Sequence, residues 1–526
     1  MPESLTVKLD LRASADFRLV IPDRKVEVVT GSDAVYNVTA DGLGTYAEDV
    51  DLSTTSLPSG ASSVIGEDPI GSEGTTTVTV ETVGVAVGTH EFYIGGDTWT
   101  PAEDIRWAAS PSSADIQSAI NAADDGDYVY VPAGSATWTA DVSIPATKGI
   151  KLIGAGINST EINANNTYHL YLDTREANAA TRVSGFSFSN TPGNFLRINY
   201  RHSGTHDFRV DHCEWDGAAA IPIFIAGWTF GVIDHCDFNN QVRCIFIEGR
   251  ADDIDGGYAG GYSWSHALTM GGADAVYVED CTANNDIAYP GQFIDANAGG
   301  RYVCRYNTLN GWQGIETHSA CTPSNAGYSY RNVRFAEIYN NTMNVNTVGT
   351  RWLATWFRSC NGMAFNNAYS SGFTSTVVAD METICYTSCG GVWSKTQEQI
   401  DALTYPYQDQ IGVGLDSGYG TAQATDEAKL WIFNNTKAGA ASAPTINFCT
   451  KAGELIQHDR DYFLQVTPFT GASGIGVGTL AARPASGLTT GVYYWATDTS
   501  TLYRATGATT WVTHYTPYTY PHPSAT

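Results

Sequence analysis

Charged residues are scarce in this chain of 526 residues, and basic residues are the scarcer of the two signs. Lysine and arginine together number 28 against 55 acidic residues, so the formal net charge is −27. A surface of that sign repels nucleic-acid phosphates and anionic lipids, which excludes both as expected partners. The excess of acids can keep a protein soluble or gather calcium.

Long apolar runs are also absent. No stretch of about 18 apolar residues occurs, which a membrane-spanning helix would need. The first residues, MPESLTVKLD, lack the basic segment and apolar run of a signal peptide. We therefore expect no membrane insertion, and a chain that is made in the cytoplasm or has lost its signal peptide. The chain is instead rich in Gly, Thr, Ser, Asn and aromatic residues, which is typical of all-β proteins.

One short pattern recurs in the middle of the chain. The stretch VDHCEW at 210–215 returns as IDHCDF at 233–238, and the two cysteines lie 236 − 213 = 23 residues apart. Two His and two Cys suggest zinc, but zinc ligand pairs usually lie about two to five residues apart. A period of about 20 to 50 residues is typical of solenoids. The repeat therefore favours stacked coils, with zinc as the minor alternative.

Further copies of this turn follow along the chain, with Cys281 and then asparagines in the place of the first cysteines. Parallel strands of adjacent coils lie about 4.8 Å apart, so equivalent residues form ladders. Asn suits such a turn because it tolerates left-handed backbone angles and its amide can bond along the stack. The pattern predicts a right-handed parallel β-helix with its cysteines reduced in the core or ladder. The expected ladder asparagines are Asn307, Asn341, Asn367 and Asn435, and the expected inward residues include Val210, Ile233, Phe238, Val278, Ile338, Phe365 and Ile432.

Residues 17–95 read as short alternating strands between turn-rich stretches, the pattern of a β-sandwich. The turn LPSG, the threonine-rich strand TTTVTVETV and the ending GTHEFYI resemble bacterial immunoglobulin-like domains of surface and virion proteins. The resemblance implies an Ig-like β-sandwich over 1–96, followed by a linker over 97–112. We expect this domain to be a spacer or to dock onto other virion or surface structural proteins.

The stretch DIQSAINAADDGDYVYVPAG begins the next domain. Ile116, Ala119, Ile120 and Ala123 fall on one helical stripe, with Ser113 as a candidate N-cap. This helix and the strand after it resemble the N-terminal cap of pectate-lyase-like β-helices and phage tailspikes. The resemblance implies a capped β-helix, which we place over 113–472. The aromatic segments YYWATD and TLYRAT then predict a hairpin and tail over 473–526 that form a small C-terminal β cap.

The stretch VIDHC resembles the signature of calcium-dependent pectate lyases, in which an aspartate helps to bind calcium. The resemblance implies a possible calcium site at Asp211, Asp234 and Asp237, whose oxygens suit this ion. Those enzymes also carry an R-x-P-x-x-R motif, which this chain lacks, and no lysine lies between Lys151 and Lys395 to serve as a base. We therefore expect no required cofactor, with calcium as the one candidate.

Three inserts, at 250–266, 311–331 and 386–429, are rich in Gly, aromatic and acidic residues and predict functional surface loops. Carboxylates can serve as acid and base, and His or Arg can move or steer a proton. The aromatic residues of the inserts could stack on sugars, although loop anchoring explains them equally well. The candidate catalytic residues are Asp295, Glu316, His318 and Arg331, and the candidate glycan-binding residues are Trp264, Trp312, Tyr328 and Tyr330.

These features lead to two hypotheses about function. The first is a virion or surface-exposed β-helix appendage, such as a phage tailspike or fibre, that binds a cell-surface glycan. The second is an exported polysaccharide lyase or glycoside hydrolase of the pectate-lyase-like superfamily. Both place the protein on a virion or outside the cell, with a polysaccharide as its partner.

The aromatic C-terminal segment predicts an assembly. Because tailspike-like β-helices commonly pack three coils side by side, we expect a homotrimer in which this segment buries its aromatic rings against neighbouring protein. The alternative is a cap on the same chain. The aromatic residues concerned are Trp495, Trp511, Tyr515, Tyr518 and Tyr520.

Overall fold

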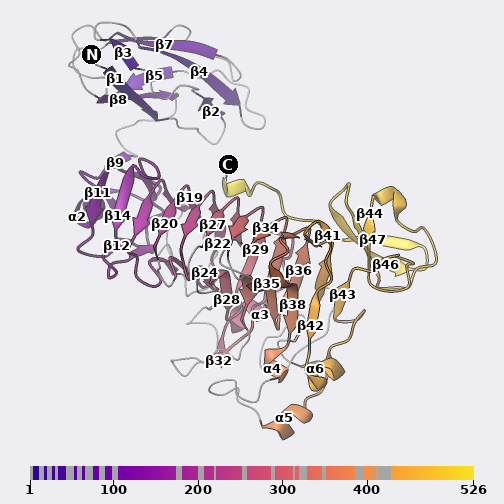
Figure 1. Cartoon of the computed structure of the whole chain (residues 1–526). Helices are drawn as coiled ribbons and strands as arrows, with labels where there is room; N and C mark the ends of the chain where they lie inside the picture. Colours follow the sequence, from indigo (N-terminus) through magenta and orange to yellow (C-terminus); the bar gives the residue numbers. More distant parts are fainter. Residues whose placement is uncertain are drawn as a thin grey trace. The chain divides into compact units, whose positions relative to one another are not determined.

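The computed structural model forms two compact units, Met1–Ile105 and Arg106–Thr526 (Figure 1). In the first unit it describes the backbone of strands β1 to β8. From Ile105 onward it describes all residues outside 173–179, 200–206, 218–220, 251–257, 286–290, 312–313, 319–328, 346–350, 386–395, 408–409, 413–427 and the last residue.

The described strands of the first unit form two four-stranded sheets. Neighbours pair antiparallel except β1 and β8, which pair parallel. The unit thus has the two sheets that the alternating pattern predicted, and its immunoglobulin-like character stays a prediction. One sheet has the order β3 (Glu27–Val29), β1 (Ser4–Asp10), β8 (Thr89–Gly96), β5 (Leu52–Thr55), and the other β2 (Phe17–Val20), β4 (Ala34–Gly42), β7 (Thr75–Glu81), β6 (Ser62–Ile65).

Three long sheets of parallel strands, one of which ends in an antiparallel pair, make up the β-helix of the second unit, as the repeat predicted. We call the sheets of 12, 11 and 10 strands sheets 1, 2 and 3. Sheet 1 contains β9 (Ile105–Trp107), β10 (Tyr128–Val131), β13 (Lys151–Gly154), β16 (Thr181–Ser184), β19 (Asp207–Asp211), β22 (Phe230–Asp234), β26 (Val276–Glu279), β29 (Arg301–Arg305), β33 (Phe335–Tyr339), β36 (Asn361–Phe365), β39 (Leu430–Phe433) and β43 (Tyr462–Leu464).

Most coils pass from sheet 1 to sheet 2 through a two-residue turn and then enter sheet 3, although five residues follow β13 before the next strand. Sheet 2 contains β11 (Gly134–Thr137), β14 (Thr160–Asn163), β17 (Ser187–Ser189), β20 (Glu214–Asp216), β23 (Asp237–Asn239), β27 (Thr282–Asn284), β30 (Thr308–Asn310), β34 (Thr342–Asn344), β37 (Ala368–Tyr369), β40 (Thr436–Lys437) and β41 (Ala440–Ala441). Sheet 3 contains β12 (Val142–Ile144), β15 (Leu170–Leu172), β18 (Leu196–Asn199), β21 (Ile223–Ala226), β24 (Arg243–Glu248), β28 (Gln292–Asn297), β31 (Gly314–Thr317), β35 (Arg351–Arg358), β38 (Phe373–Asp380) and β42 (Thr445–Asn447).

The turn between sheets 1 and 2 holds the predicted ladder, with one correction. Asn341 is buried and donates from Nδ2 to Asn367 Oδ1 at 3.0 Å, and Asn367 bonds Asn435 in the same way. These ladder residues do not hold the left-handed angle. The residue before each one does, such as Asn340 with φ 57° and Asn366 with φ 57°. In each NN pair the first asparagine therefore adopts the left-handed backbone angle, and the second forms the side-chain ladder.

The interior of the coils is apolar, as predicted, and contains the six expected inward residues other than Phe365. Phe365 was predicted wrongly. It lies on the outward face of β36, because side chains alternate along a strand and Ala364 takes the inward place. Phe365 is nevertheless buried, because Trp495 and Tyr515 of the C-terminal segment pack against it.

Helix α2 (Ser113–Ala122) packs against strands β10 and β12 at the N-terminal end of the β-helix. Its stripe residues Ile116 and Ile120 are fully buried, as predicted. The N-cap, however, is Ser112, whose Oγ accepts from the backbone N–H of Asp115 at 3.2 Å. No helix in the described part of the chain has the length and apolar character to cross a membrane.

The C-terminal segment folds into a four-stranded sheet of β44 (Ile475–Gly478), β45 (Tyr493–Ala496), β46 (Thr501–Gly507) and β47 (Thr510–Tyr515). Strands β45 and β46 form the predicted hairpin. After β47 the tail returns along the outside of sheet 1, where Arg305 donates to the carbonyls of Tyr518 and Thr519 at 2.7 and 2.8 Å. The tail aromatics therefore pack on their own chain, the alternative to contacts with a neighbour, and the homotrimer stays a prediction.

The cysteines follow the prediction in part. Among the described residues, six buried cysteines are free thiols: Cys213, Cys236, Cys244, Cys281, Cys304 and Cys360. A disulfide that the sequence analysis did not predict joins Cys385, in helix α4 (Glu382–Cys385), to Cys449. Cys449 precedes helix α6 (Thr450–Leu455), so the bond ties the two helices together.

Candidate active site on sheet 3

Two adjacent strands of sheet 3 bring Asp295 and Glu316 side by side. Asp295 of β28 is in register with Glu316 of β31, and both alternate with inward residues, so their side chains share the outer face. His318 follows β31 by one residue and lies with them. One ligand atom from each of these three side chains falls within 4.8 Å of the other two. The structure thus unites three of the four predicted catalytic residues.

Hydrogen bonds and ion pairs fix this group. His318 Nδ1 bonds the Oδ1 atom of Asp295, and its Nε2 lies 3.6 Å from Glu316 Oε1. Gln292 Nε2 donates to the same Glu316 oxygen. Asp295 is fully buried and Glu316 is nearly so, whereas the His318 side chain is 14% exposed. The imidazole is therefore the most accessible member of the group.

Burial sets the electrostatics of Glu316. Removal from water raises the pKa of its carboxyl, and the negative charge of Asp295 raises it further, against lowering by His318 and Arg358. A carboxyl with a raised pKa keeps its proton closer to neutral pH and can donate it. Asp295 has a cationic partner of its own, since Arg243 Nη1 lies 3.2 Å from its Oδ2 atom.

The site contains two arginines, and neither is the predicted Arg331. Arg243 and Arg358 come from strands β24 and β35 on either side of the carboxylates, and Arg358 lies 3.9 Å from Glu316. Arg331 is buried elsewhere, with its guanidinium 4.8 Å from the ring centroid of Trp264. Arg243 and Arg358 were not predicted, because both belong to regular strands outside the three inserts.

One outward column of sheet 3 runs through the site. The register joins outward residues of successive coils, so that aromatic side chains lie on both sides of the acidic pair. Arg358 stacks over the last of these rings, Trp356, at 4.4 Å. In coil order the column is Tyr171, Arg197, Phe224, Phe246, Asp295, Glu316 and Trp356.

The predicted sugar-stacking residues lie elsewhere. Trp264 of α3 (Gly261–Trp264) is fully buried and donates from Nε1 to the carbonyl of Asn332 at 2.8 Å, so it offers no ring face to a ligand. Trp312 and Tyr328 lie outside the described residues, and only the backbone of Tyr330 is described. Phe246 and Trp356 are the half-buried aromatics that the site does contain.

The aspartates expected to bind calcium are separated. Asp211 and Asp234 lie in sheet 1, fully buried, and Asp237 lies in sheet 2. Arg182 and Arg209 each make two hydrogen bonds to one of these buried carboxylates, at 2.6 to 3.0 Å. The three carboxylates therefore do not share one ion, and the positive partners already balance two of them.

The two His-Cys pairs also point apart, which rules against zinc. His212 and His235 stack outside the turn with ring centroids 5.1 Å apart, and each Nδ1 bonds the aspartate before it. Cys213 and Cys236 are buried on the inner side. In the described part of the chain, a set of three metal-ligating side chains occurs at Asp295, Glu316 and His318, whose donors suit a divalent cation.

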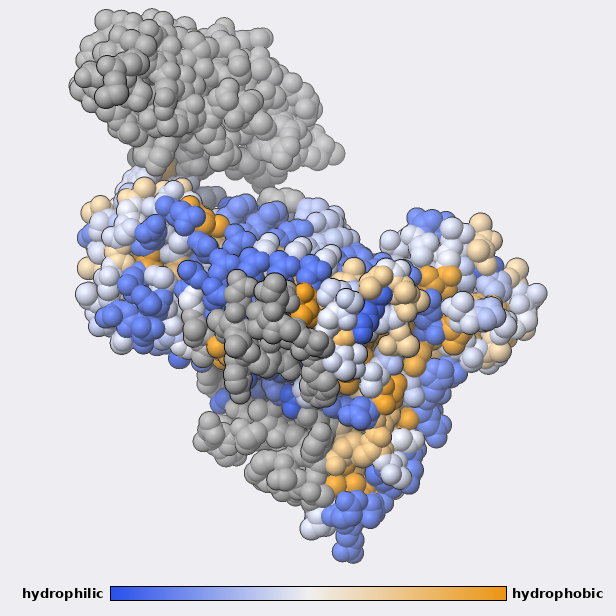
Figure 2. Space-filling view, viewed as in Figure 1, coloured by the Kyte–Doolittle hydropathy of each residue, from blue (hydrophilic) through white to orange (hydrophobic). Residues whose placement is uncertain are grey.

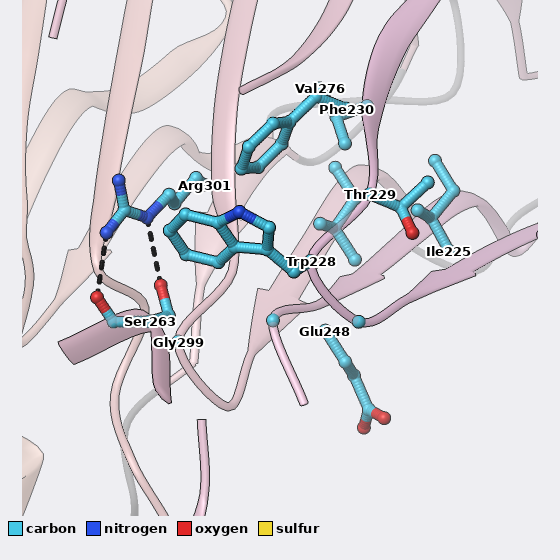
Figure 3. A pocket seen from close by; sticks show the side chains of 12 residues that line it. Ile225, Trp228, Thr229, Phe230, Glu248, Ser263, Val276, Gly299 and Arg301 are labelled. Atoms are coloured by element: carbon cyan, nitrogen blue, oxygen red, sulfur yellow. Dashed lines mark hydrogen bonds between the residues drawn. The ribbon is translucent and has the colours of Figure 1, made fainter. Parts of the chain in front are cut away.

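A small pocket borders the site (Figure 3). Its lining includes Trp228 and Thr229, from the connection between β21 and β22, and Glu248 at the end of β24. Glu248 is two residues from Phe246, the register partner of Asp295, so this wall of the pocket lies one coil before the acidic pair. Figure 3 shows the guanidinium of Arg301 against the Trp228 ring, and their separation is 4.6 Å.

Comparison with known proteins assigns no family. No family model matches the chain, and no curated protein matches it. A solved structure that does match is the catalytic domain of a GH87 alpha-1,3-glucanase in complex with tetrasaccharides. It is 11% identical, with a TM-score of 0.28, over 83% of this chain and 91% of that chain. A likeness of this degree carries no argument about activity.

Proposed function

We propose that the protein is a polysaccharide-acting β-helix that hydrolyses glycosidic bonds on the outer face of sheet 3. The carrying observation is the pair Asp295 and Glu316, whose carboxylate oxygens fall within 4.8 Å of one another and whose partners differ. Retaining glycosidases hold their two carboxyl groups about 5 to 5.5 Å apart, closer than inverting enzymes do. The spacing therefore favours a double displacement with retained configuration.

The partners of each carboxyl suggest its role. Glu316, with its raised pKa, protonates the departing glycosidic oxygen. Asp295, paired with Arg243 and bonded to His318, attacks the anomeric carbon and forms the glycosyl ester. Glu316 then accepts a proton from the water that releases the sugar. His318 keeps the Asp295 carboxylate oriented.

The column through the site supports a polymer as substrate. Sugar rings pack well on aromatic faces, and Phe246 and Trp356 stand on opposite sides of the carboxylates. Coils are about 4.8 Å apart, so a glycan chain lying along the coils would meet one outward side chain per coil. The lyase alternative lacks a comparable support, since no lysine lies in these coils.

The test is reducing-sugar release from a panel of polysaccharides by the full chain and by Glu316→Gln. We expect the variant to lose about 10³-fold in rate, the usual scale for a general acid. The matched control is Glu337→Gln, another buried glutamate in an outward position, on sheet 1. Equal rates for Glu316→Gln and the wild type on every cleaved polymer would overturn the proposal.

The placement of the protein on a virion or cell surface, with the first unit docking onto other structural proteins, stays a prediction. Neighbouring capsid and tail genes would favour it. Neighbouring sugar-uptake genes would favour an exported enzyme instead. Either location is compatible with hydrolysis at sheet 3.

A further inference from the structure

Gln292 connects a cation of the site to the candidate acid Glu316. Its Oε1 accepts from Arg243 Nε at 2.7 Å, and its Nε2 donates to Glu316 Oε1. A guanidinium can only donate, so the amide oxygen must face Arg243 and the amide nitrogen must face Glu316. The chemistry of its two neighbours therefore fixes the orientation of this amide.

A β-bulge brings Gln292 onto the outer face of sheet 3. Side chains alternate along a strand, so residues three apart, such as Gln292 and Asp295, ordinarily point to opposite faces. The register with β31 shifts between Gln292 and Ile294, and both Phe293 and Ile294 pack in the core. The extra inward residue returns Gln292 to the side of Asp295. Bulges are common beside active sites, because they re-aim a side chain in this way.

The contact from Gln292 distinguishes the two oxygens of Glu316. In a neutral carboxyl group the carbonyl oxygen is the stronger acceptor, so an N–H donor at Oε1 favours the proton on Oε2. His318 Nε2 and Arg358 Nη1 lie 3.6 and 3.9 Å from Oε1, beyond hydrogen-bond distance. Among the described residues, Oε2 makes no hydrogen bond. Oε2 is therefore the oxygen of Glu316 that can donate to a substrate.

We propose that Gln292 is a positioning residue, which holds Glu316 Oε1 as an acceptor so that Oε2 delivers the proton to the departing glycosidic oxygen. In that step the electron pair of the O–H bond stays on Glu316. The glycosidic oxygen gains the proton and keeps the electron pair of its bond to the anomeric carbon, which Asp295 attacks. The new carboxylate is the stronger acceptor, so the bond from Gln292 strengthens in the transition state. This inference rests on the proposed function.

The test is the pH profile of hydrolysis by the full chain with Gln292→Leu. Loss of a donor to a developing charge should lower kcat about 10- to 100-fold. The carboxylate form of Glu316 loses stabilisation, which raises its pKa, so the alkaline limb of kcat/KM should move up by about one to two pH units. KM should stay within about twofold, because Gln292 acts through Glu316 and not on the sugar.

The other charged groups around Glu316 stay in place in this variant, so a moved alkaline limb reports the lost amide. These groups are Asp295 of β28, His318 after β31, Arg358 of β35 and Arg243 of β24. A defect of folding would instead lower the rate at every pH and leave the limb where it is.

Two further variants keep the test independent of folding. Gln292→Glu retains an acceptor for Arg243 but replaces the donor with a second acid, so its alkaline limb should move at least as far. The matched control is Gln241→Leu. Gln241 is buried just before β24, and its Nε2 donates to the Asn239 carbonyl at 3.0 Å, so its profile should equal that of the wild type. An alkaline limb that stays in place in both Gln292 variants overturns the proposal, as does a raised KM with an unchanged kcat.

A readout without catalysis separates this inference from the hydrolysis on which it rests. In protein labelled with an NMR-active carbon at the glutamate side-chain carboxyl, the Glu316 resonance is the one that Glu316→Gln removes. Its titration gives the pKa of Glu316, which Gln292→Leu should raise by the same amount as the alkaline limb. That rise in a protein that cleaves no polysaccharide would refute the hydrolysis alone. An unchanged pKa would refute the role of Gln292.

Discussion

Sheets 1 and 3 both carry buried acids on their outer faces, but the surroundings of these acids differ. On sheet 1, Glu337 accepts from the backbone N–H of Gly271 and from the Tyr515 hydroxyl, Glu279 accepts from the backbone N–H of His522 and from Arg305, and the C-terminal segment covers both. On sheet 3, Asp295 and Glu316 lie beside one another and share His318, with Arg243 and Arg358 on either side. Each sheet 1 acid is held singly beneath the C-terminal segment, which is typical of a structural role. The two sheet 3 acids lie side by side, so that the charge of Asp295 favours a proton on Glu316, which is typical of a catalytic pair.

The largest expected effect separates function from stability. Asp295→Asn should lower the hydrolytic rate about 10³-fold or more, because the nucleophile is lost. The melting temperature should change little, because the partner cation Arg243 is 35% exposed and water can solvate its charge. Glu279→Gln on sheet 1 should do the reverse, with an unchanged rate and a lower melting temperature. Hydrolysis assays and calorimetry on both variants check this. An equal loss of hydrolytic rate in the two variants would contradict the assignment of catalysis to sheet 3 alone.

The next effect concerns the arginines. Arg305 is fully buried, and its Nε donates to Glu279 Oε2 at 2.7 Å. Arg305→Met should destabilise the fold by about 3 to 5 kcal/mol, because it strands a buried charge and frees the tail. Arg243 is 35% exposed, and Asp295 keeps its bond to His318 when Arg243 is lost, so Arg243→Met should cost less, about 1 to 3 kcal/mol. Urea unfolding compares them, and similar midpoints would contradict the expected order.

The third effect is a dependence of stability on pH. Burial raises the pKa of Glu337 to about 7, against lowering by bonds from Tyr515 and Gly271. A raised folded pKa means that the protonated acid favours the folded state, so this contribution is complete below about pH 4.5 and is lost as pH rises through 7. We expect a loss of about 3 kcal/mol between pH 5 and 8 at most.

Two other ionisable groups bear on this pH test, His522 of the tail and Arg305 beneath it. His522 has its pKa lowered to about 4 by burial and by Arg305, so its contribution is lost as pH falls through that range, on the acid side. Arg305 stays charged throughout. Glu337→Gln should therefore flatten the alkaline limb alone in denaturant titrations at several pH values. A slope that survives this substitution assigns the alkaline limb to another group.

The smallest effect is that of calcium. Because Asp211 and Asp234 are paired with arginines, calcium at about 5 mM should move the melting temperature by less than about 2 °C. A larger shift that Asp295→Asn removes and Asp211→Asn leaves would place an ion on sheet 3. A larger shift that Asp211→Asn removes would restore the sequence-based site on sheet 1.

Much of the architecture was predictable because it repeats. Each coil must bury its apolar residues against the next, so the spacing of Val210, Ile233 and Val278 already marks stacked strands. The same spacing could have indicated Arg243. This residue is in register with Gln292 of the next coil, which itself bonds Glu316 of the site. Phe365 could not be assigned to a face in this way, because both faces of β36 are apolar.

The sequence by itself determined the coils, the ladder of Asn341 and Asn367, and the presence of acids at 295 and 316, because local repeats and turn preferences set these. Only the tertiary structure decided which acids meet which cations. Arg358 and Glu316 are far apart in sequence, and the tail reaches Arg305 across more than 200 residues. Such partners depend on the number of residues in every intervening loop, which fixes coil register and which no local pattern encodes.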